Sequence, residues 1–233
     1  MVSGQGTGAA RLLDGIDRWL EPDLDRSGAI VFDDATAARL PAQVAVYRAA
    51  LALIADDPDA TIAHAQRALA LAEPVDHLQR GSATALVGLA EWTKGDIDDA
   101  SRHHGEAIDA LTAAGHISDV LGCSLALADM RIAQGRRRDA QEVLASALVL
   151  ATSRHVVRGT ADLHVGLAET LLERNDLDGT RRHLDAAAQL GEEAGLPQCA
   201  YRRRVVTARL RQIEGDLPAA LELLEEAEPL YDT

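Results

Sequence analysis

The feature that most constrains this chain is a short polar turn that returns every 40 residues. The five turns are Asp56-Asp57, Gly95-Asp96, Gly135-Arg136, Asn175-Asp176 and Gly215-Asp216, so their first residues are 39, 40, 40 and 40 positions apart. Gly, Asn and Asp tolerate the left-handed backbone that ends a helix. An aspartate that follows can cap the next helix. The period therefore predicts five helix–turn–helix units of one length.

Three columns of small residues keep the same register to the turns. Seven residues before each turn stand Ala49, Gly88, Ala128, Ala168 and Ala208; five after it stand Thr61, Ala100, Ala140, Thr180 and Ala220; twelve after it stand Ala68, Ala107, Ala147, Ala187 and Ala227. Small side chains at fixed positions, with Leu and Val in neighbouring columns, indicate two antiparallel helices that cross closely. This is the tetratricopeptide (TPR) pattern, although the usual repeat is about 6 residues shorter. A HEAT-like array of similar period is the rival interpretation.

The predicted fold is all-α, a right-handed TPR-like superhelix of antiparallel helix pairs in about five 40-residue repeats. First helices are expected near 42–54, 79–93, 117–134, 157–174 and 198–214, and second helices near 59–73, 97–113, 138–152, 178–194 and 218–230. Residues 1–40 do not fit the period and are predicted to form a connector with one helix around 9–20, so the array occupies 41–233. Because no polar capping helix follows the last unit, we expect a truncated array that continues past residue 233.

The amino-acid composition and net charge limit the kinds of partner that this chain can bind. The chain has 47% hydrophobic residues, enough for a real core, and a net charge of -14 from 37 acidic and 23 basic residues. This charge repels phosphate backbones and anionic lipids, so neither direct nucleic-acid binding nor membrane binding is expected. Cys123 and Cys199 are far apart and form no C-x-x-C pair. With no signal peptide or long apolar run, the sequence indicates a cytoplasmic protein.

The sequence carries no recognisable catalytic, cofactor or metal motif. Its only lysine, Lys94, precedes Gly95, so the phosphate-loop pattern cannot occur. His103 and His104 are adjacent, which on a helix separates them by about 100°, and we expect them at the surface rather than on a metal. The run Arg136-Arg137-Arg138 opens a second helix, an unfavourable end for positive charge, and is expected to pair with Asp139 or a neighbouring unit. We therefore expect no enzyme activity, no cofactor and no metal site.

Candidate binding residues lie in the columns of the first helices, which line the concave surface of such arrays. One column reads Leu89, Asp129, Glu169 and Arg209, another Ser82, Gly122, Asp162 and Arg202, and the last turn contributes Trp92, Ile132 and Leu172. The predicted contacts with a ligand or partner are Trp92, Asp129, Asp162, Glu169, Arg202 and Arg209. Alternatively, Glu169 pairs with Arg209 and Asp162 with Arg202 on a wet surface, and Trp92 belongs to the core.

Several stretches also resemble a known protein family in their amino-acid sequence. They are residues 11–21, 40–53, 80–100, 122–136, 158–180 and 195–221, the third of which reads RGSATALVGLAEWTKGDIDDA. These segments are similar to the TPR region of large LuxR-type transcription regulators that resemble the maltose activator MalT. In that family an ATPase of the signal-transduction type precedes the array and a helix-turn-helix follows it. Neither motif is present in this sequence, so no nucleotide- or DNA-contacting residue can be carried over.

The resemblance implies a regulatory segment that senses an effector and interacts with other proteins. Its partners would be a small-molecule effector or a protein or peptide, and the family adds self-association controlled by ATP. The second hypothesis is a stand-alone TPR adaptor that holds a partner peptide in its concave groove. An enzyme would need a convergent nucleophile, base and oxyanion site, and nothing in the sequence supplies them.

Overall fold

The computed structural model describes residues 8, 11–16, 18, 34–191 and 194–231, and the regular elements among them are helices. The chain divides into two compact units, residues 1–115 and 116–233, which are described separately. Within the described ranges, no helix has the length and apolar character needed to cross a bilayer.

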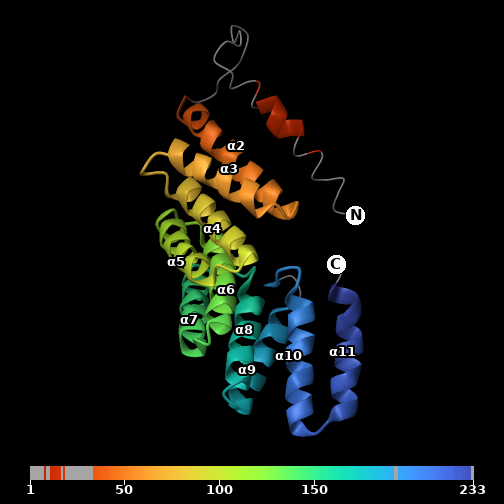
Figure 1. Cartoon of the computed structure of the whole chain (residues 1–233). Helices are drawn as coiled ribbons and strands as arrows, with labels where there is room; N and C mark the ends of the chain where they lie inside the picture. Colours follow the sequence, from red (N-terminus) through yellow and green to blue (C-terminus); the bar gives the residue numbers. More distant parts are fainter. Residues whose placement is uncertain (1–7, 9–10, 17, 19–33, 192–193, 232–233) are drawn as a thin grey trace. The chain divides into compact units, whose positions relative to one another are not determined.

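Each unit is built from consecutive antiparallel helix pairs (Figure 1). The first unit contains α2 (Asp34–Ile54), α3 (Pro58–Leu71), α4 (His77–Lys94) and α5 (Ile97–Ala113). The second contains α6 (Ile117–Ala133), α7 (Arg137–Ser153), α8 (Thr160–Leu172), α9 (Leu177–Leu190), α10 (Cys199–Glu214) and α11 (Leu217–Tyr231). Helices pack in sequence as α2–α3, α4–α5, α6–α7, α8–α9 and α10–α11. First helices also contact one another, α2 with α4, α6 with α8 and α8 with α10.

All five predicted turns have the left-handed backbone that the sequence requires. The φ angles are 57° at Asp56, 90° at Gly95, 75° at Gly135, 60° at Asn175 and 85° at Gly215. Three of the following aspartates cap the next helix by accepting a backbone N–H: Asp57 from Ala60 at 2.9 Å, Asp176 from Gly179 at 2.8 Å and Asp216 from Ala219 at 3.3 Å. Asp96, expected to do the same, makes no side-chain capping bond.

The three columns of small residues are buried in every repeat, as predicted. Fourteen of the fifteen members are alanines or threonines that are at most 6% exposed, and the fifteenth, Gly88, is also buried. Their helices can therefore approach closely, because no side chain larger than the methyl group of alanine or the hydroxyethyl group of threonine holds the backbones apart. The all-helical paired fold follows from these crossings.

The start of the array differs from the sequence prediction. Helix α2 begins at Asp34, eight residues before the expected position 42, and runs through Pro41. Proline costs the helix one backbone hydrogen bond, and the helix-favouring residues 35–40 continue the helix on its N-terminal side. Of the helix expected around 9–20, residues 11–16 are helical, with Leu13 buried and Asp14 accepting from Arg48 at 2.9 Å. The connector was expected to continue irregularly from this helix to residue 40; residues 34–40 belong instead to α2, and residues 21–33 lie outside the described residues.

His104 is buried, so the prediction of a surface histidine was wrong for this residue. Its side chain is 1% exposed, and its Nδ1 lies 3.1 Å from the Ala100 carbonyl oxygen. The room comes from Gly88: a Cβ there would lie 2.5 Å from His104 Nδ1 and 3.0 Å from the Ala100 oxygen. Burial lowers the pKa of His104 and keeps the ring neutral. The neighbouring His103 places its Nδ1 2.5 Å from Glu91 Oε2.

This close contact predicts a position-specific cost of adding one methyl group. Gly88→Ala should lower the free energy of unfolding by about 1–3 kcal/mol, because the new Cβ overlaps a buried ring and a backbone oxygen. Gly122→Ala in α6 is the matched control, since nothing lies within 4 Å of a Cβ added at this position. This substitution should raise the free energy of unfolding by up to about 1 kcal/mol. Urea denaturation followed by circular dichroism measures both. Equal effects of the two substitutions would contradict the close crossing.

Candidate functional site

The charged side chains with the densest contacts in the second unit lie where α6, α8 and α10 meet. Arg202 on α10 donates from Nη2 to Asp129 Oδ1 on α6 at 3.1 Å and to Glu169 Oε2 on α8 at 3.4 Å. Asp129 and Glu169 occupy the same register of successive repeats, and the packing of first helices brings them together. Arg202 precedes Arg209, the α10 residue in this register, by seven residues or about two helical turns, and its long side chain still reaches both carboxylates.

This cluster continues into a run of alternating charges. Arg209 Nη1 lies 3.6 Å from Glu169 Oε1, and its Nη2 bonds Glu173. Glu173 Oε2 in turn lies 3.9 Å from Arg137 Nη2 on α7. The predicted Glu169–Arg209 pair is therefore confirmed, as is the pairing of Arg136 with Asp139. We call Asp129, Glu169 and Arg202 the acidic cluster, because two carboxylates share one guanidinium.

The acidic cluster is partly withdrawn from water. Side-chain exposures are 35% for Asp129, 30% for Glu169 and 23% for Arg202. Burial raises the pKa of Asp129; the Arg202 charge opposes this shift and the Glu169 charge adds to it. Burial by itself would lower the pKa of Arg202, but Asp129 and Glu169 outweigh it and raise that pKa. Poorly hydrated carboxylates such as these bind an incoming cation or N–H donor more strongly than exposed ones.

Asp162 does not belong to this surface. It is 3% exposed near the start of α8, where its Oδ2 accepts the Leu196 backbone N–H at 2.8 Å. The expected Asp162–Arg202 ion pair does not form, because Arg202 turns to the two carboxylates of the acidic cluster instead. Burial raises the pKa of Asp162, and the Leu196 hydrogen bond partly offsets the shift. Its role in the structure is to hold the segment that leads into α10.

The structure thus brings four of the six predicted residues together, namely Asp129, Glu169, Arg202 and Arg209. Asp162 lies in the same unit but faces the interior. Trp92 is half-buried on α4 in the first unit. Whether any of these residues contacts a ligand stays a prediction.

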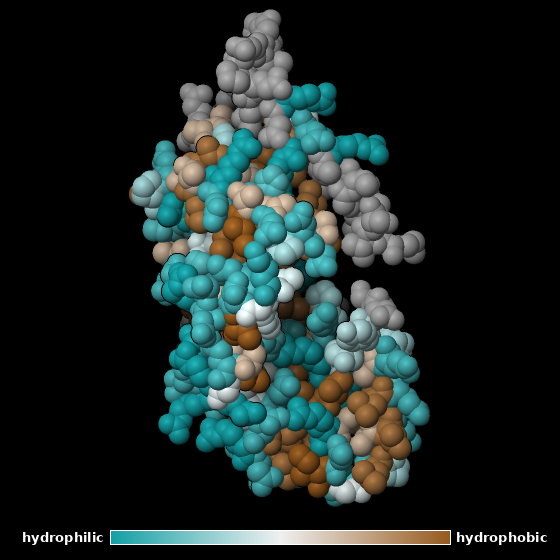
Figure 2. Space-filling model, in the orientation of Figure 1, coloured by the Kyte–Doolittle hydropathy of each residue, from teal (hydrophilic) through white to brown (hydrophobic). Residues whose placement is uncertain are grey.

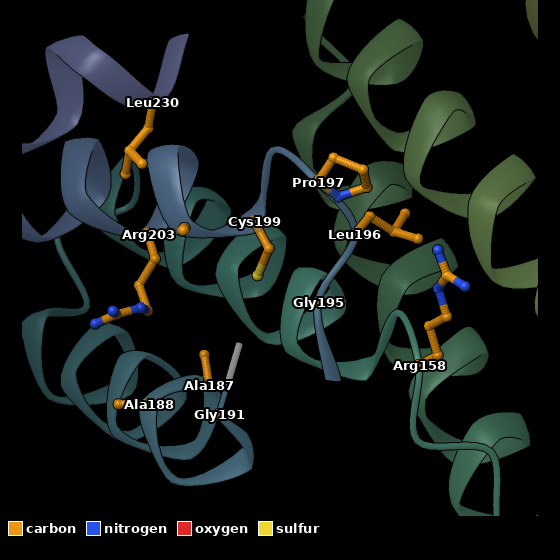
Figure 3. Close-up of a pocket in the computed structure, with 11 residues that line it drawn as sticks. Arg158, Ala187, Ala188, Gly191, Gly195, Leu196, Pro197, Cys199, Arg203 and Leu230 are labelled. Carbon is orange, nitrogen blue, oxygen red and sulfur yellow. The ribbon is translucent and has the colours of Figure 1, made fainter. Parts of the chain in front are cut away.

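A pocket that the sequence did not reveal lies between α9, α10, α11 and the segment before α10 (Figure 3). Its volume is about 510 Å³, and its walls are largely small or apolar residues. The close-up shows the Cys199 side chain between Leu196 and Pro197 on one side and Arg203 on the other. Burial raises the pKa of the Cys199 thiol to about 12, so the group stays protonated and is a poor nucleophile. The one sequence signal was the breaker residues Gly191, Gly195 and Pro197 between two helices.

Two imidazoles also meet in this unit without any prediction from the sequence. His164 on α8 and His183 on α9 have their Nδ1 atoms 2.9 Å apart, and the ring planes are tilted by 42°. Burial lowers the pKa of both rings. In the described part of the chain no three His, Cys, Asp or Glu side chains gather as metal ligands do.

The buried carboxyl group of Asp162 gives a stability prediction with a defined pH dependence. Asp162→Ala should lower the free energy of unfolding by about 1–3 kcal/mol, because the Leu196 N–H loses its acceptor. Asp162→Asn keeps an acceptor oxygen and should cost less. Because folding raises the pKa of Asp162, ionisation of this carboxyl group destabilises the folded protein; the destabilisation is absent at low pH and grows as the pH rises toward the raised pKa.

The wild-type protein should therefore gain stability relative to Asp162→Asn as pH falls from about 7 to about 4. Urea denaturation of both proteins across this range measures the difference. A difference that is constant with pH would show that Asp162 titrates as it does in the unfolded chain.

Solved structures share this fold at low sequence identity. BtubC (BKLC) from P. vanneervenii has a TM-score of 0.73 and 14% identity over 99% of this chain and 91% of its own. The Rap conjugation gene regulator of the plasmid pLS20, in complex with the Phr* peptide, has a TM-score of 0.62 and 13% identity over 91% of this chain and 60% of its own. A Signal Transduction ATPase with Numerous Domains (STAND) protein with a TPR sensor, from Pyrococcus horikoshii, has a TM-score of 0.65 and 11% identity over 97% of this chain and 40% of its own.

No curated protein sequence matches this chain significantly. The model of one protein family does match it: the MalT-like TPR region, over residues 42–233. That range contains all five turns and all three columns of small residues. The chain is therefore a TPR interaction module, and it belongs to the family of MalT-like TPR regions.

Proposed function

We propose that this chain is the effector-sensing and protein-interaction segment of a LuxR-type transcription regulator resembling MalT, and that it acts by binding rather than by catalysis. The family match supports this proposal. So do two structural neighbours: a STAND protein with a TPR sensor and a Rap gene regulator in complex with a peptide. Cys199, a buried and protonated thiol, offers no nucleophile that would favour an enzyme.

The acidic cluster is the observation that carries the proposed binding mode. Asp129 and Glu169 present partly desolvated carboxylate oxygens on adjacent first helices, and their shared partner is a single Arg202 nitrogen. A peptide bearing Lys or Arg would compete with Arg202 for these oxygens. The displaced guanidinium could then donate to a peptide carbonyl or carboxylate, so no buried charge would be left unpaired. A hydrogen bond to a charged group contributes about 1.5–3 kcal/mol.

A stand-alone adaptor that binds a partner peptide is the second candidate, because the same first-helix surface would serve it. The DNA that flanks the reading frame separates the two. A phosphate loop encoded upstream and a helix-turn-helix encoded downstream in one frame are expected for the regulator. Independent stop and start signals on both sides would contradict the regulator and leave the adaptor.

The binding mode is tested by neutralising the two carboxylates of the acidic cluster. A positional-scanning hexapeptide library, screened by thermal shift and then by fluorescence polarisation, should select peptides with Lys or Arg. For those peptides, Asp129→Asn combined with Glu169→Gln should weaken binding at least about tenfold, which corresponds to about 1.4 kcal/mol. Circular dichroism should show unchanged helicity.

The chain supplies a closely matched control. Arg181 on α9 bridges Asp178 of α9 and Glu214 at the end of α10, as Arg202 bridges Asp129 and Glu169. Asp178→Asn combined with Glu214→Gln removes the same charge and should leave peptide binding unchanged. An equal loss of peptide affinity in both double variants would show that only net charge matters. Unchanged affinity in both would show that the acidic cluster does not bind the peptide.

A further inference from the structure

Helix α11 carries an exposed apolar stripe. Leu217, Leu221, Leu224 and Tyr231 are 57%, 61%, 45% and 68% exposed, and their spacing of four, three and seven residues places them on one helix face. Figure 2 shows brown, apolar surface over α11. Ala220 and Ala227, on the face toward α10, are buried. The stripe is thus additional to the contact that holds α11 in its hairpin.

The positions equivalent to Leu224 in the preceding repeats show what a leucine at this register packs against. Leu144 and Leu184 precede Leu224 by two repeats and one repeat, and they are 1% and 6% exposed. Leu144 shares a core cluster with Leu163 and Leu167 of α8. Leu184 shares another with Val206 and Leu210 of α10. In both cases the covering helix supplies two aliphatic side chains four residues apart, which lie on one face.

The stripe also borders a hollow large enough for several side chains. A pocket of about 450 Å³ is lined by Tyr201, Val205, Leu224, Ala227, Glu228 and Tyr231. Tyr201 and Tyr231 form part of its lining, and their rings contact each other with centroids 5.4 Å apart. Aliphatic residues of an incoming helix can enter this hollow, as Leu and Val pack between the preceding repeats.

The charge around the stripe specifies the partner further. Helix α11 contains four glutamates and no basic residue. Glu226 pairs with Arg204 of α10 at 3.2 Å, whereas Glu225 and Glu228 make no ion pair with the described residues. Glu228 lies within the stripe and Glu225 at its edge, at about 20° and 80° from Leu217 on the helix. Pairing two copies of α11 would bring like charges together, so an α11–α11 contact between two copies is disfavoured and a basic helix is favoured.

We propose that the exposed face of α10 and α11 docks a basic amphipathic helix of a partner protein, with two aliphatic residues four apart against Leu217, Leu221 and Leu224 and Lys or Arg opposite Glu225 and Glu228. This surface lies on the last hairpin and is separate from the acidic cluster. Its occupation therefore does not depend on the function proposed for that cluster.

A segment of the chain itself provides the probe. A fluorescein-labelled peptide of residues 199–214, with Cys199→Ser, carries the Val206–Leu210 pair, five arginines and one glutamate. Titrated with the full chain, it should bind saturably in fluorescence anisotropy. Leu217→Ser combined with Leu221→Ser should weaken binding at least about tenfold. Val149→Ser, at a residue of α7 that is 70% exposed, is the control and should leave it unchanged.

Charge reversal tests the electrostatic part. Glu228→Lys should weaken peptide binding several-fold at low salt, whereas Glu222→Lys, on a different side of α11, should have a much smaller effect. Absence of saturable binding, or equal weakening by Val149→Ser and the stripe variant, would overturn the proposal. So would a dimer in analytical ultracentrifugation that Leu221→Ser dissociates, because the face would then belong to a second copy.

Discussion

The close crossing of two helices at small buried residues is the constraint on which the rest of this structure depends. At each crossing, Ala, Gly or Thr stands where a larger side chain would push the helices apart. Threonine is tolerated there because its hydroxyl finds a partner: Thr61 and Thr180 each donate to a backbone carbonyl one helical turn earlier, at 2.8 Å. Gly88 shows the opposite solution, in which a missing Cβ makes room for the neutral ring of His104.

These crossings set the position of the charged groups. Because hairpins of one length stack on their first helices in the second unit, Asp129 and Glu169 come to lie side by side and a single arginine can reach both. Like-charged groups in partial burial are costly unless a cation is shared. Arg202 supplies that cation here, so the carboxylates of the acidic cluster are paired without a ligand. The proposed basic ligand would compete with Arg202 for them.

Repetition also explains the surface on the last hairpin. A leucine at the register of Leu144, Leu184 and Leu224 is buried wherever another first helix covers it, and exposed on α11. The same residue type is therefore core in one repeat and exposed surface in another. With the acidic cluster, this gives the second unit two proposed binding surfaces of different chemistry, one polar and one mainly apolar.

The sequence by itself determined the period, the helix pairs and the buried columns, because left-handed turns and close crossings each admit few residue types. Residues such as Asn175 and Ala168 were therefore identified without any knowledge of the fold. It also predicted the Glu169–Arg209 pair, since stacked repeats place equal registers together. It did not predict that α2 runs through Pro41, that Asp162 is buried on the Leu196 N–H, or that Arg202 bonds Asp129 instead. Long charged side chains choose among several partners, and burial, packing and the path of residues 194–199 decide which one is reached; these are properties of tertiary structure alone.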